Sequence, residues 1–224
     1  DVILPDGVLS GKNFEWTKFN GVDLSGKDLS FSNFQYATFD NANLEGVNLE
    51  GADFIQVDFT KIKNKSLAGV DLSEASFAHS NLSGVSLAGT ILHTTNFWQA
   101  DLSGLDFTIT DVITDGLTFV DANLSNSNFE GVNLSPKEQY FQVFQNKASF
   151  VNLSDTDLIT NLFGKQNTLL IVSKEASGND LVVDYILFNN FKNANLENAN
   201  FKNTELWYSN FYSANLTNAD LSGA

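Results

Sequence analysis

This 224-residue chain contains no cysteine, no methionine and no arginine. Without cysteine, neither a disulfide framework nor a thiolate metal site is available. The two histidines, His79 and His93, have no partner at metal-ligand spacing and no nucleophile in a recognisable motif beside them. We therefore expect a protein that is not an enzyme and that has no metal site and no cofactor.

Basic residues are scarce. Twelve lysines stand against 27 aspartates and glutamates, which gives a net charge of −15. Such a chain repels phosphate and has no guanidinium to grip it, so we expect no direct binding to nucleic acid. An acidic surface keeps an elongated protein soluble, or it imitates nucleic acid toward a basic partner.

Long apolar runs are also missing, since none approaches the roughly 20 residues that a membrane span requires. The chain starts at Asp1 and has no methionine there. This start favours a processed product such as a mature exported chain, and hence an extracytoplasmic location. Trimming of the sequence explains the same start.

What the chain has instead is a period of five. Large apolar residues recur at every fifth position. On an α-helix a step of five turns the side chain by about 140°, and on a straight strand it reverses the face, so neither element buries all of these residues on one side. A corner within every five residues solves this, because each short straight piece then points its large residue inward, together with the small residue two places before it. The clearest example is Phe191, Leu196, Phe201, Leu206, Phe211, Leu216 and Leu221.

The units that begin at Ala42, Ala52, Ala100 and Ala219 read Ala-Asn/Asp-Leu/Phe followed by two variable residues. They resemble the repeats of pentapeptide-repeat proteins. The resemblance implies an all-β fold, a right-handed quadrilateral parallel β-helix with four pentads to a coil. One period from end to end predicts a single solenoid over residues 1–224.

Stacked aromatic columns should fill the solenoid, because residues 20 apart lie one coil above each other. Phe14, Phe34 and Phe54 form one predicted column, and Phe19, Phe39 and Phe59 form another. The phase breaks at 60–66, where we expect a bulge, and two extra residues enter between Val112 and Phe119.

Two insertions are predicted in the second half. Ser135-Pro-Lys-Glu reads as a helix capping box, and Tyr140, Phe141 and Phe144 follow at helical spacing, so we predict a short helix within about 135–147. The β-rich runs 168–173 and 181–186 flank a turn-rich segment and predict a β-hairpin within 164–184. Function concentrates in such loops.

Aspartate or asparagine precedes many inward residues, as at Asp23, Asn43 and Asn215. Columns of these oxygens are able in principle to hold calcium. Hydrogen bonds from the side chains to the turning backbone explain the pattern more economically.

Outward aromatic residues are the best candidates for a partner-binding surface. Trp16 and Tyr36 are 20 residues apart in an unbroken frame and should stack. Phe188 with Tyr208 repeats this spacing, and Trp207 and Tyr212 lie nearby. Paired columns form a patch of the kind that marks contact sites, although the hairpin is an alternative cover for the second patch.

The last pentads end on Leu216 and Leu221 with no capping segment. An open coil exposes unpaired backbone beside the apolar interior. We therefore expect self-association, or contact with a neighbour, through this end.

Two classes of function remain. The favoured one is a non-enzymatic scaffold, a rigid acidic β-helix that binds a protein partner or forms part of an assembly. The alternative, implied by the family resemblance, is a DNA mimic that inhibits or protects a nucleic-acid enzyme such as gyrase. A glycan-binding or hydrolytic β-helix ranks third, because it needs paired carboxylates in a groove lined by tryptophan.

Overall fold

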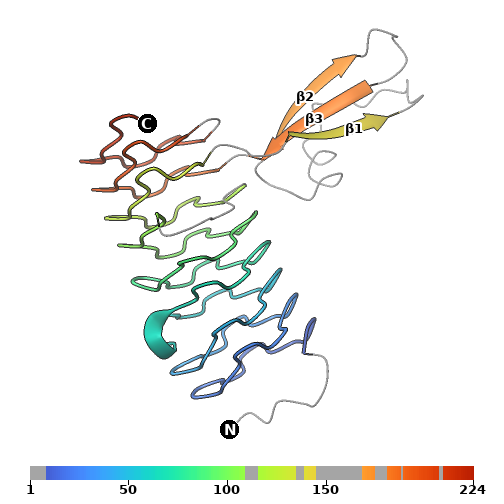
Figure 1. Ribbon diagram of the computed structural model, residues 1–224, viewed down its shortest axis with the longest axis vertical. Coiled ribbons are helices and arrows are strands. Elements are labelled where there is room, and N and C mark those ends of the chain that lie inside the picture. The colour runs from blue at the N-terminus through green and yellow to red at the C-terminus, as the bar shows by residue number, and fades with distance from the viewer. Residues whose placement is uncertain are drawn as a thin grey trace.

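The computed structural model describes residues 9–108, 116–134, 139–144, 168–174, 181–187, 189–206 and 209–224. Most of them form a stack of square coils, with the N-terminal and C-terminal coils at opposite ends (Figure 1). A separate three-stranded sheet stands to one side of the C-terminal half of the stack (Figure 1). The coils form the quadrilateral β-helix that the resemblance to pentapeptide-repeat proteins implies, with the corner in every pentad that the period of five predicts (Figure 1).

Each pentad makes one side of a coil and one corner. At the first corner the carbonyl of Phe14 accepts a hydrogen bond from the N–H of Thr17 at 3.0 Å, and Trp16 between them has φ of 60°. A positive φ at the second of the two central residues, as at Trp16, is typical of a type II turn. Because this corner recurs at most pentads of the described coils, the chain resets its direction about every five residues and keeps the large side chains inside.

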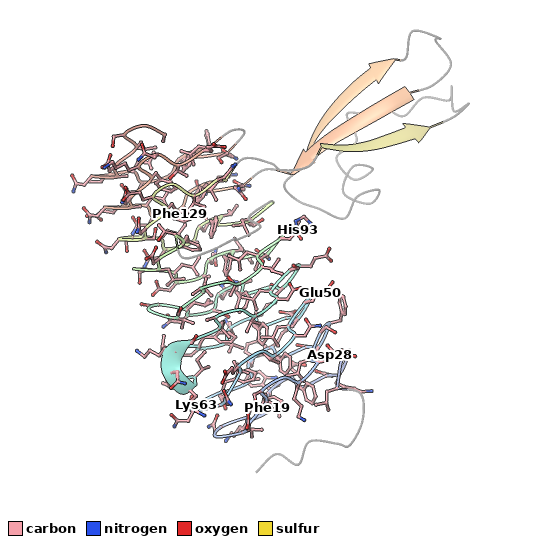
Figure 2. All side chains as sticks on the ribbon, in the orientation of Figure 1. Phe19, Asp28, Glu50, Lys63, His93 and Phe129 are labelled. Atoms are coloured by element: carbon pink, nitrogen blue, oxygen red, sulfur yellow. The ribbon has the colours of Figure 1, made fainter. Side chains whose placement is uncertain are left out.

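Parallel bridges join successive coils. Asn13 pairs with Asn33, and Asn33 pairs with Asp53, at the spacing of 20 that four pentads require. The spacing rises to 23 between Asp53 and Ser76, because a short 3-10 helix, η1 (Lys63–Lys65), lies between these coils. This helix is the bulge expected at 60–66. The side chain of Lys63 projects beside it, on the outside of the stack (Figure 2).

The interior is a set of aromatic and leucine columns. Phe14 stacks on Phe34 at 5.2 Å between ring centroids, and Phe34 stacks on Phe54 at 5.1 Å. The predicted second column is also confirmed, since Phe19 stacks on Phe39 at 5.1 Å. Phe19 and Phe129, near the two ends of the stack, lie inside it (Figure 2). We call the first set the phenylalanine column: Phe14, Phe34, Phe54, Phe77, Phe97, Phe119, Phe191 and Phe211.

The aspartates and asparagines before the inward residues form hydrogen-bonded ladders on the outside. The Oδ1 atom of Asp23 accepts from the backbone N–H of Ser25 at 3.0 Å and from Nδ2 of Asn43, one coil on, at 2.9 Å. The same arrangement links Asp28 to Ser30 and to Asn48. These side chains therefore hold the turning backbone, as the sequence indicates.

These ladders make the free energy of unfolding depend on pH. The Ser25 hydroxyl and backbone N–H hold the pKa of Asp23 below its ordinary value of 3.8, and Ser30 does the same for Asp28. A carboxyl whose pKa is lower in the folded state than in the unfolded state stabilises the fold fully above its unfolded-state pKa. This stabilisation is lost as the pH falls through the folded-state pKa. We expect the free energy of unfolding, from urea titrations, to fall below about pH 4 and to fall less in Asp28→Asn. A gain of stability on acidification would show instead that relief of the −15 charge dominates.

A phenylalanine lies across a glycine at another corner. The ring of exposed Phe31 lies where a Cβ on Gly51 would stand, whereas a Cβ on Gly46 meets nothing within 4 Å. Both glycines have left-handed backbone, with φ of 62° and 63°. Gly46→Ala should therefore cost only the left-handed penalty of about 1–2 kcal/mol.

Gly51→Ala should cost more, by about 1 kcal/mol, because the alanine must also displace the Phe31 ring. Urea unfolding of both variants tests this. In a Phe31→Ala background the two glycine substitutions should become equal, and a difference that persists there would contradict the contact.

The separate sheet has the strand order β1-β3-β2. Strands β2 (Thr168–Lys174) and β3 (Leu181–Leu187) occupy the two β-rich runs and pair antiparallel, with Thr168 opposite Leu187. Strand β1 (Gln139–Phe144) pairs antiparallel with the other edge of β3. The residues between the strands lie outside the described ranges.

The helix predicted within 135–147 is wrong over 139–144, where β1 forms. Tyr140, Phe141, Val143 and Phe144 are aromatic or β-branched, and such residues favour a strand when a partner edge is present. Here β3 provides that edge, from Gln139 opposite Ile186 to Phe144 opposite Leu181. Pairing with a strand about 40 residues away in the sequence thus overrides the local capping signal, whose residues 135–138 are outside the described ranges.

The stack continues directly across the insertion. Thr118 bridges Asn190 and Asn133 bridges Glu205, so the coil that ends at Leu134 is followed by the coil that starts at Asn190. The chain therefore leaves and re-enters the stack at the same level. At the re-entry point, the buried Asn189 side chain accepts from the N–H of Leu117 at 2.8 Å and donates to the carbonyl of Leu134 at 2.7 Å.

Candidate functional site

One of the four corners differs from the others in composition. It consists of the two-residue turns that follow the phenylalanine column, and we call it the aromatic corner. None of its turns contains glycine, whereas each of the other corners uses glycine in several described coils. Its turns are residues 15–16, 35–36, 55–56, 78–79, 98–99, 120–121, 192–193 and 212–213.

Backbone hydrogen bonds tie these turns into one line. The N–H of Trp16 donates to the carbonyl of Gln35, and the N–H of Tyr36 donates to that of Ile55, each at 3.0 Å. The same bond recurs in the later coils, and in the last of them the N–H of Asn193 donates to the carbonyl of Tyr212 at 2.9 Å. The aromatic corner is therefore a continuous edge along the described coils.

Bulky residues on this edge hold a conformation that L-residues avoid. Trp16 and Tyr36 have φ of 60° and His79 has φ of 59°. The left-handed region costs a residue with a Cβ roughly 1–2 kcal/mol, and glycine occupies it without that cost. The fold needs only a turn here, and glycine would form that turn without the cost.

The predicted pairing of Trp16 and Tyr36 is confirmed. Their rings stack with centroids 4.2 Å apart and planes 5° from parallel. Trp16 is 66% exposed, Tyr36 is half-buried, and the indole N–H donates to Glu15 at 3.1 Å. A cavity lies beside the pair, toward the next corner.

A second aromatic group occupies the middle of the edge. The His79 and Trp98 rings pack in a T-shaped arrangement with centroids 4.7 Å apart, and the Trp98 indole N–H donates to Asp121 at 3.3 Å. Asn193 also donates to Asp121, and this bond together with that from Trp98 outweighs partial desolvation and lowers the pKa of the carboxyl. Trp98 is 41% exposed although it is fixed on both sides.

The third group lies near the C-terminal coils. Tyr212 is 70% exposed, and Nζ of Lys192 lies 6.0 Å from the centroid of its ring. Tyr212 stands on the same corner as Trp16, several coils away. Exposed aromatic side chains therefore occur near both ends and in the middle of one edge.

The partner-binding candidates from the sequence divide into two groups. Trp16, Tyr36 and Tyr212 lie on the aromatic corner, whereas Phe188, Trp207 and Tyr208 lie outside the described residues. Trp98 and His79 were missed. The signal that would have found them is the frame shift at 60–66: after three residues are subtracted for the bulge, His79 falls above Tyr36 and Gln56.

The final coil exposes part of its apolar interior. Leu221 is 40% exposed, whereas Leu24, which holds the same place in the first full coil, is fully buried. Leu216 is half-buried and packs against the core. A role for these two leucines in association stays a prediction.

In the ranges that the structure describes, no three histidine, aspartate or glutamate side chains gather in the way a metal ion requires. Over the same ranges, no helix is long and apolar enough to cross a membrane. The surface thus offers contact area on the aromatic corner and, among the described residues, no grouping of metal ligands.

Comparison with known proteins agrees with this architecture. Residues 28–61, 71–108 and 190–224 match the model of pentapeptide repeats, in eight copies. The chain belongs to the pentapeptide-repeat family. The matched segments lie in the stack of coils, and residues 135–188 fall between them, as expected for an insertion into a pentapeptide-repeat solenoid. Among curated proteins, none matches the sequence.

Several solved pentapeptide-repeat structures are similar to this chain. Full-length QnrB1, a plasmid-mediated fluoroquinolone resistance protein, is 16% identical over 97% of this chain and 88% of its own, with a TM-score of 0.49. HetL of the cyanobacterium Nostoc, a protein involved in heterocyst differentiation regulation, is 17% identical over 96% and 90%, with a TM-score of 0.26. A thylakoid-lumen protein of Arabidopsis thaliana is 24% identical over 51% and 69%, with a TM-score of 0.23. These likenesses concern the fold and carry no argument about function.

Proposed function

We propose that this pentapeptide-repeat protein is a non-enzymatic scaffold that binds a protein partner along its aromatic corner. The observation that carries the proposal is the glycine-free edge on which Trp16, Trp98 and Tyr212 stay exposed. Tryptophan and tyrosine are the residues on which binding energy concentrates at protein interfaces. An edge that keeps them in strained or solvent-exposed positions is built for contact rather than for folding.

The rigidity of the edge supports the same function. Trp16 is held by its stack on Tyr36, and Trp98 is held between His79 and Asp121. A side chain that is ordered before binding loses little conformational entropy on binding. The coils therefore present a preorganised row of anchors to an extended partner surface.

Site-specific photo-crosslinking tests the proposal. A benzoyl-phenylalanine is placed at Gln56, which is exposed on the aromatic corner, or at Glu45, which is exposed on a glycine-containing corner of a neighbouring coil. In cells of the source organism we expect a discrete protein adduct from position 56 and none from position 45. The proposal fails if both positions give the same adducts or if position 56 gives none.

A Trp16→Gly variant separates binding from folding. Glycine adopts the left-handed turn freely, so the substitution should leave the free energy of unfolding within about 1 kcal/mol of the parent. The adduct from position 56 should nevertheless be lost. A variant that keeps its adduct would show that Trp16 makes no contact with the partner.

The acidic surface does not favour a DNA mimic. The carboxylates of the described turns are divided over all four corners, so no corner collects a row of them, whereas duplex DNA carries one charge per about 1.7 Å along its axis. We therefore expect no inhibition of gyrase supercoiling at low micromolar concentration. Inhibition that disappears when these carboxylates are neutralised would contradict this. The carboxylates to be neutralised are those of the described turns, two on each corner. Glu15 and Asp121 lie on the aromatic corner, and the other three corners carry Asp40 with Glu197, Glu45 with Glu130, and Glu50 with Glu74.

A further inference from the structure

The cavity beside Trp16 and Tyr36 combines aromatic rings with carboxylates. It measures about 290 Å³ and runs from the aromatic corner across the face that carries Thr38 and Asp58, as far as the next corner. The two rings line one side, and Asp40 lies at the other. The remaining lining residues are Ala37, Gln56 and Lys61.

The charges around the cavity favour a cation. Asp58 contacts Lys61 at 3.5 Å, so one lysine already sits against this carboxylate. Asp40 forms no ion pair with any residue in the described part of the chain, which leaves the cavity with one uncompensated negative charge. Aromatic rings attract cations through their quadrupole, and carboxylates attract them directly.

The size of the cavity favours a single side chain. Pockets for drug-sized ligands measure about 300–1,000 Å³, so this one stands at or below their lower limit. A guanidinium is planar, stacks on aromatic faces and donates to two carboxylates at once, whereas an ammonium is compact and strongly hydrated. Arginine therefore fits the mixture of rings and carboxylates better than lysine does.

We propose that this cavity binds the guanidinium group of an arginine side chain from the partner protein. The proposal rests on the proposed function and adds the chemistry of the partner, a basic segment that places one arginine between the Trp16–Tyr36 stack and Asp40 with Asp58. The chain's own charge of −15 supports approach by such a segment.

A titration followed by NMR tests the proposal directly. The indole N–H signal of Trp16 is identified in ¹⁵N-labelled protein by its absence in Trp16→Phe. N-acetyl-arginine amide is then compared with N-acetyl-citrulline amide, which has nearly the same shape without the charge. We expect a saturable shift of the Trp16 signal with arginine and about tenfold weaker binding of citrulline. Equal binding of the two probes, or no shift with arginine, overturns the proposal.

Four variants and one sugar sharpen the result. Asp40→Asn and Asp58→Asn should each weaken arginine binding severalfold, whereas Lys61→Gln should strengthen it, because that substitution removes a competing cation. Phe31→Ala, at an exposed aromatic residue on another corner, should change nothing. Weaker binding in Lys61→Gln, or a shift with cellohexaose that exceeds the shift with arginine, counts against a cation site.

This experiment is independent of the crosslinking experiment. If crosslinks from position 56 persist while arginine fails to bind, only the chemistry assigned to the cavity is wrong. If arginine binds and the crosslinks are absent, the cavity is a cation site and the scaffold proposal fails.

Discussion

Phe34→Ala is expected to lower the free energy of unfolding by about 3–5 kcal/mol, the range for large-to-small substitutions of a buried phenylalanine. Phe34 is fully buried, with the rings of Phe14 and Phe54 stacked above and below it. The rings of Phe19 and Phe39 also contact it, at centroid distances of 5.7 and 5.6 Å. The ladder hydrogen bonds fix the spacing of the coils, so the column cannot close over the missing ring and a cavity remains.

Phe31→Ala is the matched control, since it deletes the same atoms from a side chain that is 59% exposed. Its cost should be less than about 1 kcal/mol. Urea unfolding followed by circular dichroism measures both variants, and that signal should be dominated by β structure. Equal losses in the two variants would show that the inward phase of the pentads is assigned wrongly.

The interior of this fold is predictable because its period is strict. An inward residue every five positions requires a corner in every pentad, and the columns Phe14–Phe34–Phe54 and Phe19–Phe39–Phe59 then follow from the four pentads to a coil that the family resemblance implies. The outward ladders of Asp23 and Asn43 are equally local, because each side chain bonds to a turn two residues on. Short-range rules suffice for both.

The parts that escaped prediction depend on long-range placement. Strand β1 has a local helical signal and becomes a strand because β3 provides an edge for it. The aromatic corner was recognised only at Trp16 and Tyr36, where no interruption had yet shifted the frame. Trp98 and Tyr212 join that corner only when the spacings of 23, 22 and 72 between paired coils are known, as between Asp53 and Ser76, Asn96 and Thr118, and Thr118 and Asn190.

The same spacings identify where an insertion is tolerated. A solenoid accepts extra residues at a corner if the coil beyond it regains the register of the ladder. At the largest interruption a buried polar side chain links the two coils, in addition to the stacked rings and the backbone bridges. Asn189 is 1% exposed and joins the coil that precedes the insertion to the coil that follows it.

Asn189→Ala is therefore expected to cost about 2–4 kcal/mol. The substitution removes two hydrogen bonds and leaves the N–H of Leu117 and the carbonyl of Leu134 without this partner inside the stack. Each buried group that loses its partner costs about 1–3 kcal/mol. Asn215→Ala, at an exposed rung of the outer ladder, should cost about 1 kcal/mol or less. Equal costs at the two positions in urea unfolding would mean that Asn189 is one more ladder residue and not the link across the insertion.

Asn189→Asp distinguishes the loss of the donor from the loss of volume. An ionised aspartate still accepts from Leu117, but it sets a carboxylate against the carbonyl of Leu134, so burial should raise its pKa in the folded state. A carboxyl with a raised folded-state pKa is least harmful when protonated, so this variant should be closest to the parent at acidic pH. Its deficit should grow as the pH rises through that folded-state pKa, opposite to the acid sensitivity of the outer ladders. A deficit that stays constant between about pH 4 and pH 8 would show that the carbonyl of Leu134 does not need the donated hydrogen bond.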